Sequence, residues 1–414
     1  MMNKILVIGG GAAGTLAAIT AARAGAKVTL WEKNEKIGKK LAITGKGRCN
    51  LTNAAPVPEI IQNLPGNGSF LYGAINRFNN EDVMAFFREL GVPLKVERGQ
   101  RVFPVSDKAL DIVNALLNEM KRLKVDIHYK TTATALSVKE GQIEGAYCGD
   151  FFAPFEKVII ATGGISYPAT GSTGDGYEFA KAVGHTIIPL DPSLVPLVTE
   201  EKWVSDAMGL ALKNTKVQLW ADETKLSEDF GEMLFTHFGV SGPVILSLSK
   251  AACAFWQKQP QAKLKLYLNL KPALTAEQLD ARIQKDWQKY IRKEFQNSLS
   301  ELLPKSLIPV IVELSGIDPH KPVHQVTKAE RLRLTVLLQK LPLTVTGTRP
   351  IAEAIVTAGG VNTKEINPKN MESKLVKGLY FVGEVIDVDG YTGGYNLQAA
   401  FSSAWVAATA AAEQ

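Results

Sequence analysis

Three glycines near the N-terminus are spaced as in loops that bind the phosphates of a dinucleotide. Gly9, Gly11 and Gly14 follow a short apolar run and precede an alanine-rich segment that ends near Gly25. In such a loop the first glycine permits a tight turn, the second lets the backbone approach a pyrophosphate, and the third lets helix and strand pack closely. N–H groups at the start of the helix face the phosphates. The spacing predicts a dinucleotide site, but by itself it does not separate FAD from NAD.

The segment after these glycines begins to separate the two cofactors. Glu32 ends the next strand-like run, and we expect its carboxylate to accept hydrogen bonds from the adenosine ribose. A polar, glycine-rich stretch, 37–53, follows directly, where an NAD domain would normally begin another helix. We interpret it as a loop along an extended cofactor, with Lys40, Arg48 and Asn50 near the phosphates and the flavin ring. A surface loop without a ligand is the alternative.

Two later glycine clusters favour FAD. Residues 161–164 follow the apolar run 157–161, which is typical of a buried parallel strand, and ligands of open α/β sheets lie at the carboxyl ends of strands. Segment 170–176 either closes over the flavin region or caps a helix. Segment 382–398 ends a strand and begins a helix, whose N-terminus could stabilise the negative charge of a reduced flavin. Because glycine turns so far apart in sequence can share one site only around a long ligand, the pattern favours FAD.

Longer segments resemble one known family. They are GKKLAITGKGRCNLTN, ATGGISYPATGSTGDGYEFA, FTHFGVSGP, TAGGV and FVGEVIDVDGYTGGYNLQAA, and they are similar to those of the bacterial BaiN-like, aminoacetone-oxidase family of FAD-binding flavoproteins. The resemblance covers essentially the whole chain. It implies an α/β fold in which a glutathione-reductase-like, Rossmann-type FAD-binding domain is split by an inserted β-barrel and a helical subdomain, with FAD bound non-covalently. It also implies that nine positions border the cofactor: Ala13, Glu32, Arg48, Asn50, Gly163, Gly383, Asp387, Asn396 and Leu397.

The motifs and the resemblance together define a cofactor site and three catalytic candidates. We assign to cofactor binding Gly9, Gly11, Ala12, Ala13, Gly14, Glu32, Lys33, Lys40, Gly45, Arg48, Asn50, Ala133, Ala161, Thr162, Gly163, Gly383, Glu384, Asp387, Gly394, Asn396 and Leu397. The His237 imidazole could move a proton during catalysis, with a histidine packed between aromatic rings as the alternative. Tyr391 and Tyr395 could donate to a substrate or shield the flavin ring, with ordinary packing as the alternative.

The patterns along the chain predict a split nucleotide-binding domain. Residues 1–190 form its first part, and residues 348–414, which return to strand, glycine turn and helix, form its second. Prolines and alternating stretches predict an inserted β-barrel over 191–274, completed by a strand near 342–347. Helical spacing with lysine and arginine on the solvent side predicts a helical subdomain over 275–341.

Within the first part, the pattern predicts elements that surround the sheet. Asn80, Glu81 and Asp82 resemble the capped start of one helix, and apolar residues at helical spacing predict another over 109–123. Short strand-like stretches from 127 to 155 predict a β-meander.

Composition and charge describe an ordinary globular chain of 414 residues with a formal net charge of +6. A mildly basic surface suits an anionic cofactor or substrate but lacks the concentrated charge of a dedicated nucleic-acid binder. The basic run 282–293 carries aromatic residues, yet its apolar positions fit a buried stripe, so we do not expect a nucleic-acid partner. Three separated cysteines with no CxxC pair argue against a disulfide framework, a zinc ribbon and a dithiol redox centre, so no metal site is expected, and they suit a reducing cytoplasm. Glycines break the apolar run 5–22, so neither a membrane helix nor a targeting segment is expected.

These observations predict a cytoplasmic FAD-dependent oxidoreductase that exchanges a hydride with a small organic substrate. NAD(P)H or oxygen would be the other redox partner. The sequence shows no second GxGxxG motif after another strand, so NAD(P)H would dock transiently as a reductant rather than bind a domain of its own. Two alternatives stay open: a flavoprotein that binds or modifies RNA, and a non-catalytic FAD-binding interaction module. The oligomeric state is also left open.

Overall fold

The computed structural model describes residues 4–289 and 291–413 and divides the chain into two compact units. The first unit runs to Pro192 and resumes at Ala354, and the second comprises the residues between them. Each unit has its own hydrophobic core. The second unit therefore interrupts the first in sequence.

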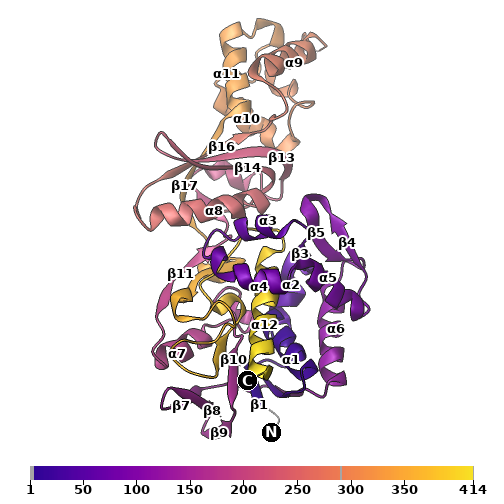
Figure 1. Cartoon of the computed structure of the whole chain (residues 1–414). Coiled ribbons are helices and arrows are strands. Elements are labelled where there is room, and N and C mark those ends of the chain that lie inside the picture. Colours follow the sequence, from indigo (N-terminus) through magenta and orange to yellow (C-terminus); the bar gives the residue numbers. More distant parts are fainter. Residues whose placement is uncertain (1–3, 290, 414) are drawn as a thin grey trace. The chain divides into compact units, whose positions relative to one another are not determined.

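A five-stranded parallel sheet forms the centre of the first unit (Figure 1). In spatial order its strands are β19 (Leu379–Phe381), β10 (Lys157–Ile160), β1 (Lys4–Ile8), β2 (Lys27–Glu32) and β6 (Asp126–Tyr129). Most residues of β19, β10, β1 and β2 are apolar and buried, as a parallel sheet covered on both faces requires, whereas the edge strand β6 is largely exposed. Strand β19 comes from the second part of the divided unit and pairs with β10 from the first part, so one sheet joins both parts.

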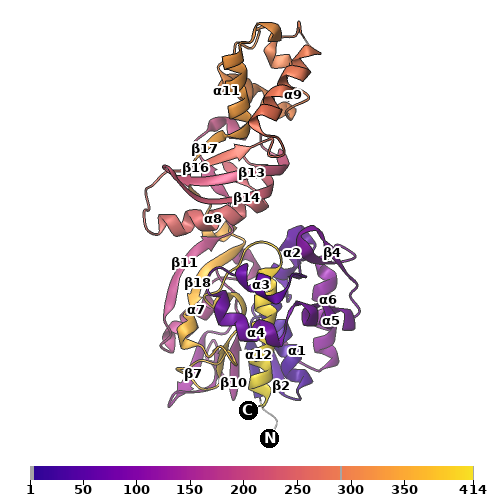
Figure 2. The same ribbon diagram turned by 45° about the horizontal axis from the view of Figure 1, so that its top comes forward.

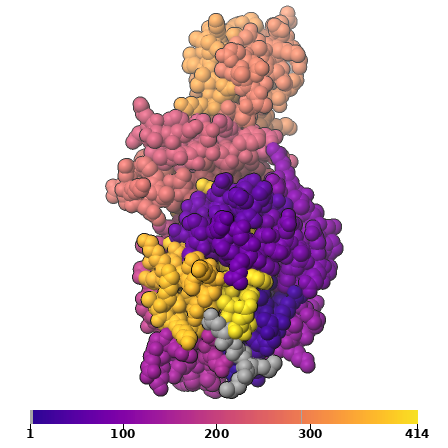
Figure 3. All heavy atoms as spheres, in the orientation of Figure 1, coloured from indigo at the N-terminus to yellow at the C-terminus, as the bar shows by residue number. Residues whose placement is uncertain are grey.

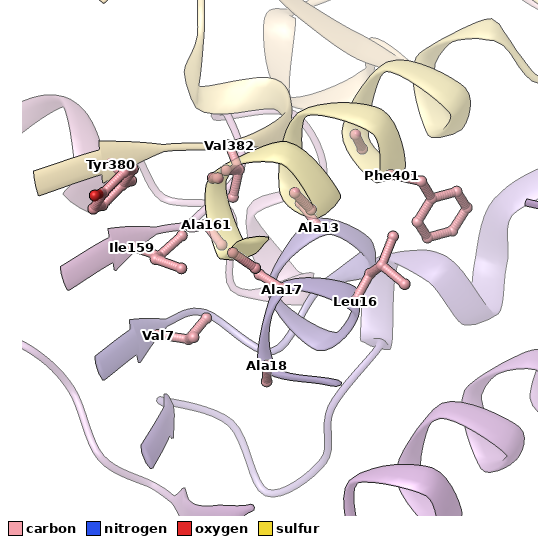
Figure 4. Close-up of a cluster of buried hydrophobic side chains, with 14 of the residues drawn as sticks. Val7, Ala13, Leu16, Ala17, Ala18, Ile159, Ala161, Tyr380, Val382 and Phe401 are labelled. Atoms are coloured by element: carbon pink, nitrogen blue, oxygen red, sulfur yellow. The ribbon is translucent and has the colours of Figure 1, made fainter. Parts of the chain in front are cut away.

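Two alanine-rich helices from opposite ends of the chain pack together in this unit. They are α1 (Ala12–Arg23) and α12 (Tyr395–Glu413), and Figure 4 shows them beside the strands. Ala13, Leu16 and Ala17 of α1 lie near Phe401 of α12, while Val7, Ile159 and Tyr380 come from three neighbouring strands. Small side chains allow the helices to approach closely. In the space-filling view the C-terminal residues lie against the N-terminal ones (Figure 3).

Further elements surround the sheet and form its loops. The helices are α2 (Lys39–Gly47), α3 (Val57–Gln62), α4 (Tyr72–Arg77), α5 (Asn80–Glu89), α6 (Ala109–Arg122) and α7 (Asp175–Ala182). Strands β3 (Thr52–Asn53), β5 (Arg101–Pro104) and β4 (Leu94–Glu97) make one small sheet, and β7 (Ala135–Lys139), β8 (Gln142–Cys148) and β9 (Phe151–Pro154) make another. Strands β11 (Ile187–Ser193) and β18 (Val356–Val361) pair with each other.

The second unit is built on a closed six-stranded barrel. Its strands are β12 (Leu197–Thr199), β15 (Gly239–Ser241), β14 (Thr224–Phe235), β13 (Ala211–Ala221), β16 (Leu264–Asn269) and β17 (Leu341–Thr348). Alternate residues point into the core, as the strand period of two requires: Leu264, Leu266 and Leu268 of β16 are fully buried. Helix α8 (Pro243–Trp256) packs on the barrel.

Three helices lie between β16 and β17 in sequence, and Figure 2 labels two of them. They are α9 (Ala276–Gln288), α10 (Ile308–Ser315) and α11 (Lys328–Gln339). Their buried residues, including Ile283, Ile311 and Leu334, belong to the same hydrophobic core as the barrel. Side-chain capping boxes at Thr275 and Thr327 define the starts of α9 and α11.

The predicted fold class is confirmed: an α/β unit is interrupted by a barrel that carries helices. Three local predictions were wrong. The stretch 37–53 contains α2, which Gly38 introduces in a left-handed conformation before the helix breaks at 44–46. The cap of α5 is Asn79, whose side chain accepts from the N–H groups of Glu81 and Asp82. Strand β6 joins the main sheet, and the meander begins only at β7.

Within the described residues, no helix combines the length and apolar character needed to cross a membrane.

Candidate cofactor site

The first glycine turn follows β1 and fits tightly against the end of β10. Gly9 has a φ of +106°, and a Cβ on it would lie 2.6 Å from the carbonyl oxygen of Ala161. A Cβ on Gly14 would lie 1.8 Å from the carbonyl oxygen of Gly9. Gly11 differs, because a Cβ there would meet no atom within 4 Å. Open space therefore lies at the glycine expected to face a pyrophosphate. No side chain caps α1, so the N–H groups of its first turn remain available to an anion.

Glu32 is fixed beside this turn at the end of β2. It is 7% exposed, and its Oε2 accepts a hydrogen bond from the N–H of Gly10 at 2.8 Å. Its Oε1 accepts from the backbone N–H and the side-chain amide of Asn34, both at 2.7 Å. Because each carboxylate oxygen has two lone pairs, Glu32 can accept a further hydrogen bond from a ribose hydroxyl.

Segment 170–176 lies against the same strand end. Lys33 donates to Thr173 and, at 2.6 Å, to Asp175, while the side-chain amide of Asn34 donates to the carbonyl oxygen of Thr170. The segment also precedes α7, whose N-cap is Gly174. It therefore begins a helix and contacts the predicted adenosine side. The contact through Asn34 was not predicted from the sequence.

The early and late glycine clusters meet in the first unit. A Cβ on Gly383 would lie 2.9 Å from the Cβ of Ala13. A Cβ on Gly394 would lie 2.4 Å from the backbone of Thr52. The Asn50 side chain, oriented to satisfy its neighbours, accepts from the N–H of Gly394 at 3.0 Å. Residues more than 300 positions apart thus surround one region, as the sequence pattern requires for a long ligand.

A buried hydroxyl without a partner lies at the end of β10. In the described part of the chain, Oγ1 of Thr162 is buried and forms no hydrogen bond. A Cβ on Gly176 would lie 2.1 Å from this oxygen, and the following Gly163 has a φ of +73°. Buried polar atoms are normally satisfied, so the orphaned hydroxyl suits a ligand with polar atoms. Together with the uncapped helix and the open Gly11, it fits the FAD that the sequence predicts.

Lys40 and Glu384 form a partly buried ion pair in this unit. Nζ of Lys40 donates to Oε2 of Glu384 at 2.7 Å and to Oγ of Ser166 at 2.6 Å. Oε1 of Glu384 accepts from the N–H of Thr357 at 2.9 Å and from Ser166 at 3.0 Å. Sequence reasoning named Lys40 and Glu384 separately as cofactor contacts. It did not pair them and missed Ser166 and Thr357, although both lie within quoted glycine motifs. Because Glu384 neutralises Lys40, this lysine is not a free cation for a phosphate.

Arg48 is also engaged by neighbouring acids. Its guanidinium pairs with Glu97 and Asp107 at 2.5 and 2.6 Å and stacks 4.1 Å from the centre of the Phe103 ring. The hydrogen bonds that Arg48 donates to Glu97 and, secondarily, to Asp107 raise the pKa of Arg48. The structure thus directs the Arg48 charge to β4 and the loop after β5.

Several assigned residues in the last glycine segment hold the loop itself. Asp387 accepts from the side-chain amide of Asn67 at 2.8 Å. Asn396 accepts from the N–H of Gly390 at 2.8 Å and donates to its carbonyl oxygen at 2.9 Å. Leu397 is half-buried against the core. These contacts shape the turn before α12.

Three assigned positions contribute backbone or packing rather than polar side chains. Ala12 is the first residue of α1, and Ala133 is buried in the core. Gly45 has a φ of +58°, and a Cβ on it would lie 3.0 Å from the backbone nitrogen of Asn50.

The three catalytic candidates lie in different surroundings. Tyr395 is buried at the start of α12, where burial, and secondarily Glu59, raises the pKa of its phenol. Tyr391 is half-buried, and its N–H donates to the carbonyl oxygen of Asn63. His237 belongs to the second unit, where it is exposed and its ring lies 5.0 Å from that of Phe238.

Arg349 and Glu353 accompany His237 in the second unit. Arg349 stacks 4.7 Å from the centre of the Phe238 ring and pairs with Glu353 at 2.6 Å. The pKa of Glu353 is lowered mainly by Arg349 and, to a smaller extent, by His237. His237 therefore lies near the ion pair of Arg349 and Glu353.

The chain is similar to known proteins over essentially its whole length. A family model described as the HI0933-like protein Rossmann domain matches residues 3–410. The chain is 35% identical over 415 residues to a 3-dehydro-bile acid delta(4,6)-reductase of Clostridium scindens, with both chains fully covered. It is 31% identical over 417 residues to a ribosomal RNA dihydrouridine synthase of Haemophilus influenzae, covering 100% of this chain and 99% of the relative.

Solved structures support the fold alone. The chain resembles 3-ketosteroid delta1-dehydrogenase from Sterolibacterium denitrificans with a TM-score of 0.54 and 13% identity, covering all of both chains. It resembles a flavocytochrome c3 fumarate reductase in its open conformation with a TM-score of 0.53 and 17% identity, covering 100% of this chain and 78% of the other.

Proposed function

The chain belongs to the HI0933-like Rossmann family and is an FAD-dependent oxidoreductase, and from this premise we propose that it reduces a carbon–carbon double bond conjugated to a carbonyl group. The names of two relatives that match over their full length both denote this class of reaction. A delta(4,6)-reductase of a 3-dehydro bile acid saturates double bonds conjugated to a ketone. Dihydrouridine differs from uridine by two hydrogens across a double bond conjugated to a ring carbonyl. Reduction of a double bond conjugated to a carbonyl adds a hydride to the carbon of that bond farther from the carbonyl, and a proton to the nearer carbon.

The meeting of the two glycine clusters is the observation that supports the proposal most. Gly383 lies close to Ala13, and Gly394 lies close to Thr52, so early and late segments of the chain meet. A Cβ on Gly11 would still meet no atom within 4 Å. FAD, bound there and reduced, would supply the hydride.

Residues of this chain bind and orient the cofactor. The first turn of α1 provides N–H groups for the pyrophosphate, and Glu32 accepts from the ribose hydroxyls. The N-terminus of α12 favours negative charge near it. We propose NAD(P)H as a transient electron donor, with oxygen as the alternative redox partner.

The proton requires a separate donor. His237, Tyr391 and Tyr395 are the candidates, and water is the alternative. The raised pKa of Tyr395 makes its phenol a weaker acid, so this residue is better suited to donating a hydrogen bond to the substrate carbonyl than to giving up its proton.

We propose a small, apolar unsaturated ketone as the substrate, rather than RNA. The relative with the higher identity acts on a bile acid, and the charge of +6 is spread among 47 basic and 41 acidic residues. Reduction of uridine in RNA would use the same chemistry, so it is the second candidate.

The test uses the FAD-loaded chain under anaerobic conditions. NADH or NADPH is added until the visible flavin absorption bleaches, and the reduced protein is mixed with a 3-oxo steroid that carries Δ4 and Δ6 double bonds, its saturated counterpart, or a uridine-containing ribosomal RNA fragment. We expect the unsaturated steroid to restore the flavin absorption and to gain two hydrogens by mass spectrometry. The saturated steroid is the control. Reaction with RNA alone would keep the reaction class and overturn the small-molecule substrate, and reaction with neither would overturn both.

A further inference from the structure

The second unit contains a pocket that shares no residue with the cofactor site. It has a volume of about 840 Å³ and lies between the β13–β14 hairpin and the segment that joins β16 to α9. Lys271, Phe230, Leu270 and Leu274 are among its lining residues. The volume is within the range of small-molecule sites, roughly 300–1,000 Å³.

Most charged groups in this pocket are already satisfied. Nζ of Lys216 pairs with Oε1 of Glu228 at 3.2 Å, and Lys225 binds the other oxygen of Glu228 at 3.0 Å. Asp229 accepts from the N–H of Phe230 at 2.7 Å. Burial raises the pKa of Asp229 although this hydrogen bond and one with Ser247 oppose the shift.

Lys271 differs from these groups. It is half-buried, and among the described residues its Nζ forms no hydrogen bond or ion pair. Burial lowers its pKa, and the positive charge of Arg282 lowers it further. Arg282 itself pairs with Asp286 at 2.8 Å, whereas in the part of the chain that the structure describes no carboxylate forms an ion pair with Lys271. A cation removed from water without a counter-charge is unfavourable, and an anion beside it would relieve the cost.

The other walls are apolar. Phe230 is 50% exposed, and Leu270 and Leu274, in the segment that joins β16 to α9, are half-buried. A ligand that suits both the walls and the cation carries an apolar body and one negative group. We propose that this pocket binds a small amphiphilic anion, with its carboxylate on Lys271 and its apolar body against Phe230 and Leu274.

The experiment measures binding of 4-phenylbutyrate and of the neutral alcohol 4-phenylbutan-1-ol to the FAD-loaded full chain by isothermal titration calorimetry. We expect the carboxylate to bind at least tenfold more tightly than the alcohol, which is about the loss of one charge-assisted hydrogen bond. Lys271→Met should remove this preference while retaining the apolar contact. Phe230→Ala should weaken both ligands. Lys263→Met is the matched control, because Lys263 lies in the same unit but outside the pocket and is paired with Glu200, and it should leave the preference within about twofold.

A second measurement needs no variant. Acetic anhydride labels lysines of the native chain, and mass spectrometry follows each site. We expect 4-phenylbutyrate to slow labelling of Lys271 several-fold, and the alcohol to leave it unchanged. The proposal is overturned if both ligands bind equally, if Lys271→Met keeps the preference, or if neither ligand binds and labelling of Lys271 is unaffected. Urea unfolding followed by tryptophan fluorescence, compared with the wild type, confirms that each variant is folded.

Discussion

Replacing Glu32 by alanine should weaken both FAD binding and the folded state. Its carboxylate accepts three hydrogen bonds, from Gly10 and from two groups of Asn34, at 2.7–2.8 Å, and it is 7% exposed. Each hydrogen bond to a charged group contributes about 1.5–3 kcal/mol, but water reaches the space left by alanine and replaces part of the loss. We therefore expect the free energy of unfolding of the FAD-free chain to fall by about 2–4 kcal/mol.

The effect on the cofactor is separate from the effect on stability. Loss of the ribose contact should raise the dissociation constant of FAD roughly 10- to 100-fold, which corresponds to one charged hydrogen bond. Titration of FAD by fluorescence quenching measures this constant, and urea unfolding of the FAD-free chain measures stability. Glu35→Ala is the matched control, because Glu35 is the exposed partner of Lys130 at 2.9 Å. An FAD affinity within twofold of the wild type, or an equal loss in the Glu35 variant, would refute the role of Glu32.

Other predictions test the turns and the buried titratable groups. Burial raises the pKa of Cys49 to about 12, so iodoacetamide at pH 8 should label Cys49 only after unfolding, as peptide mass spectrometry can follow. Burial lowers the pKa of His185, although Glu365 opposes this shift. The unfolded chain therefore binds a proton first as the pH falls below about 6.5, and the free energy of unfolding should decrease there. Urea titrations at pH 5–7 should show a smaller change of this free energy with pH in His185→Gln than in the wild type. Gly394→Ala places a Cβ 2.4 Å from the backbone of Thr52 at a φ of +99°, so the purified variant should lose flavin absorption; normal retention of flavin would contradict the proposed closure.

The local part of the cofactor site could be predicted from the sequence because its signals are local. The glycine spacing, the following helix and Glu32 all lie within 24 residues, and the βαβ unit has the predicted order. The stretch 37–53 was harder. Its glycines indicate a loop. Instead, Gly38, whose own backbone is in the left-handed conformation, precedes a short helix, and Gly45 contributes to the break in that helix.

The remaining contacts depend on tertiary structure that no spacing encodes. Ser166 and Thr357 meet on the carboxylate of Glu384, although 191 residues separate them. Arg48 pairs with acids that β4 and the loop after β5 bring to it. Such partners belong to elements whose relative placement is fixed only when the sheets form. Residue types and motifs could therefore single out Lys40, Glu384 and Arg48, but they could not predict the ion-pair and hydrogen-bond partners of these residues.

The place of β19 in the main sheet also has a consequence for how the chain matures on the ribosome. This strand and the helix after it are translated after the whole barrel unit, yet they supply one wall of the cofactor site. The barrel unit is continuous in sequence and has a core of its own, so it can fold before β19 is available to pair with β10. Flavin capture is therefore a late event in biosynthesis, and a nascent chain stalled before Leu379 would present the exposed edge of β10 instead of a finished enzyme.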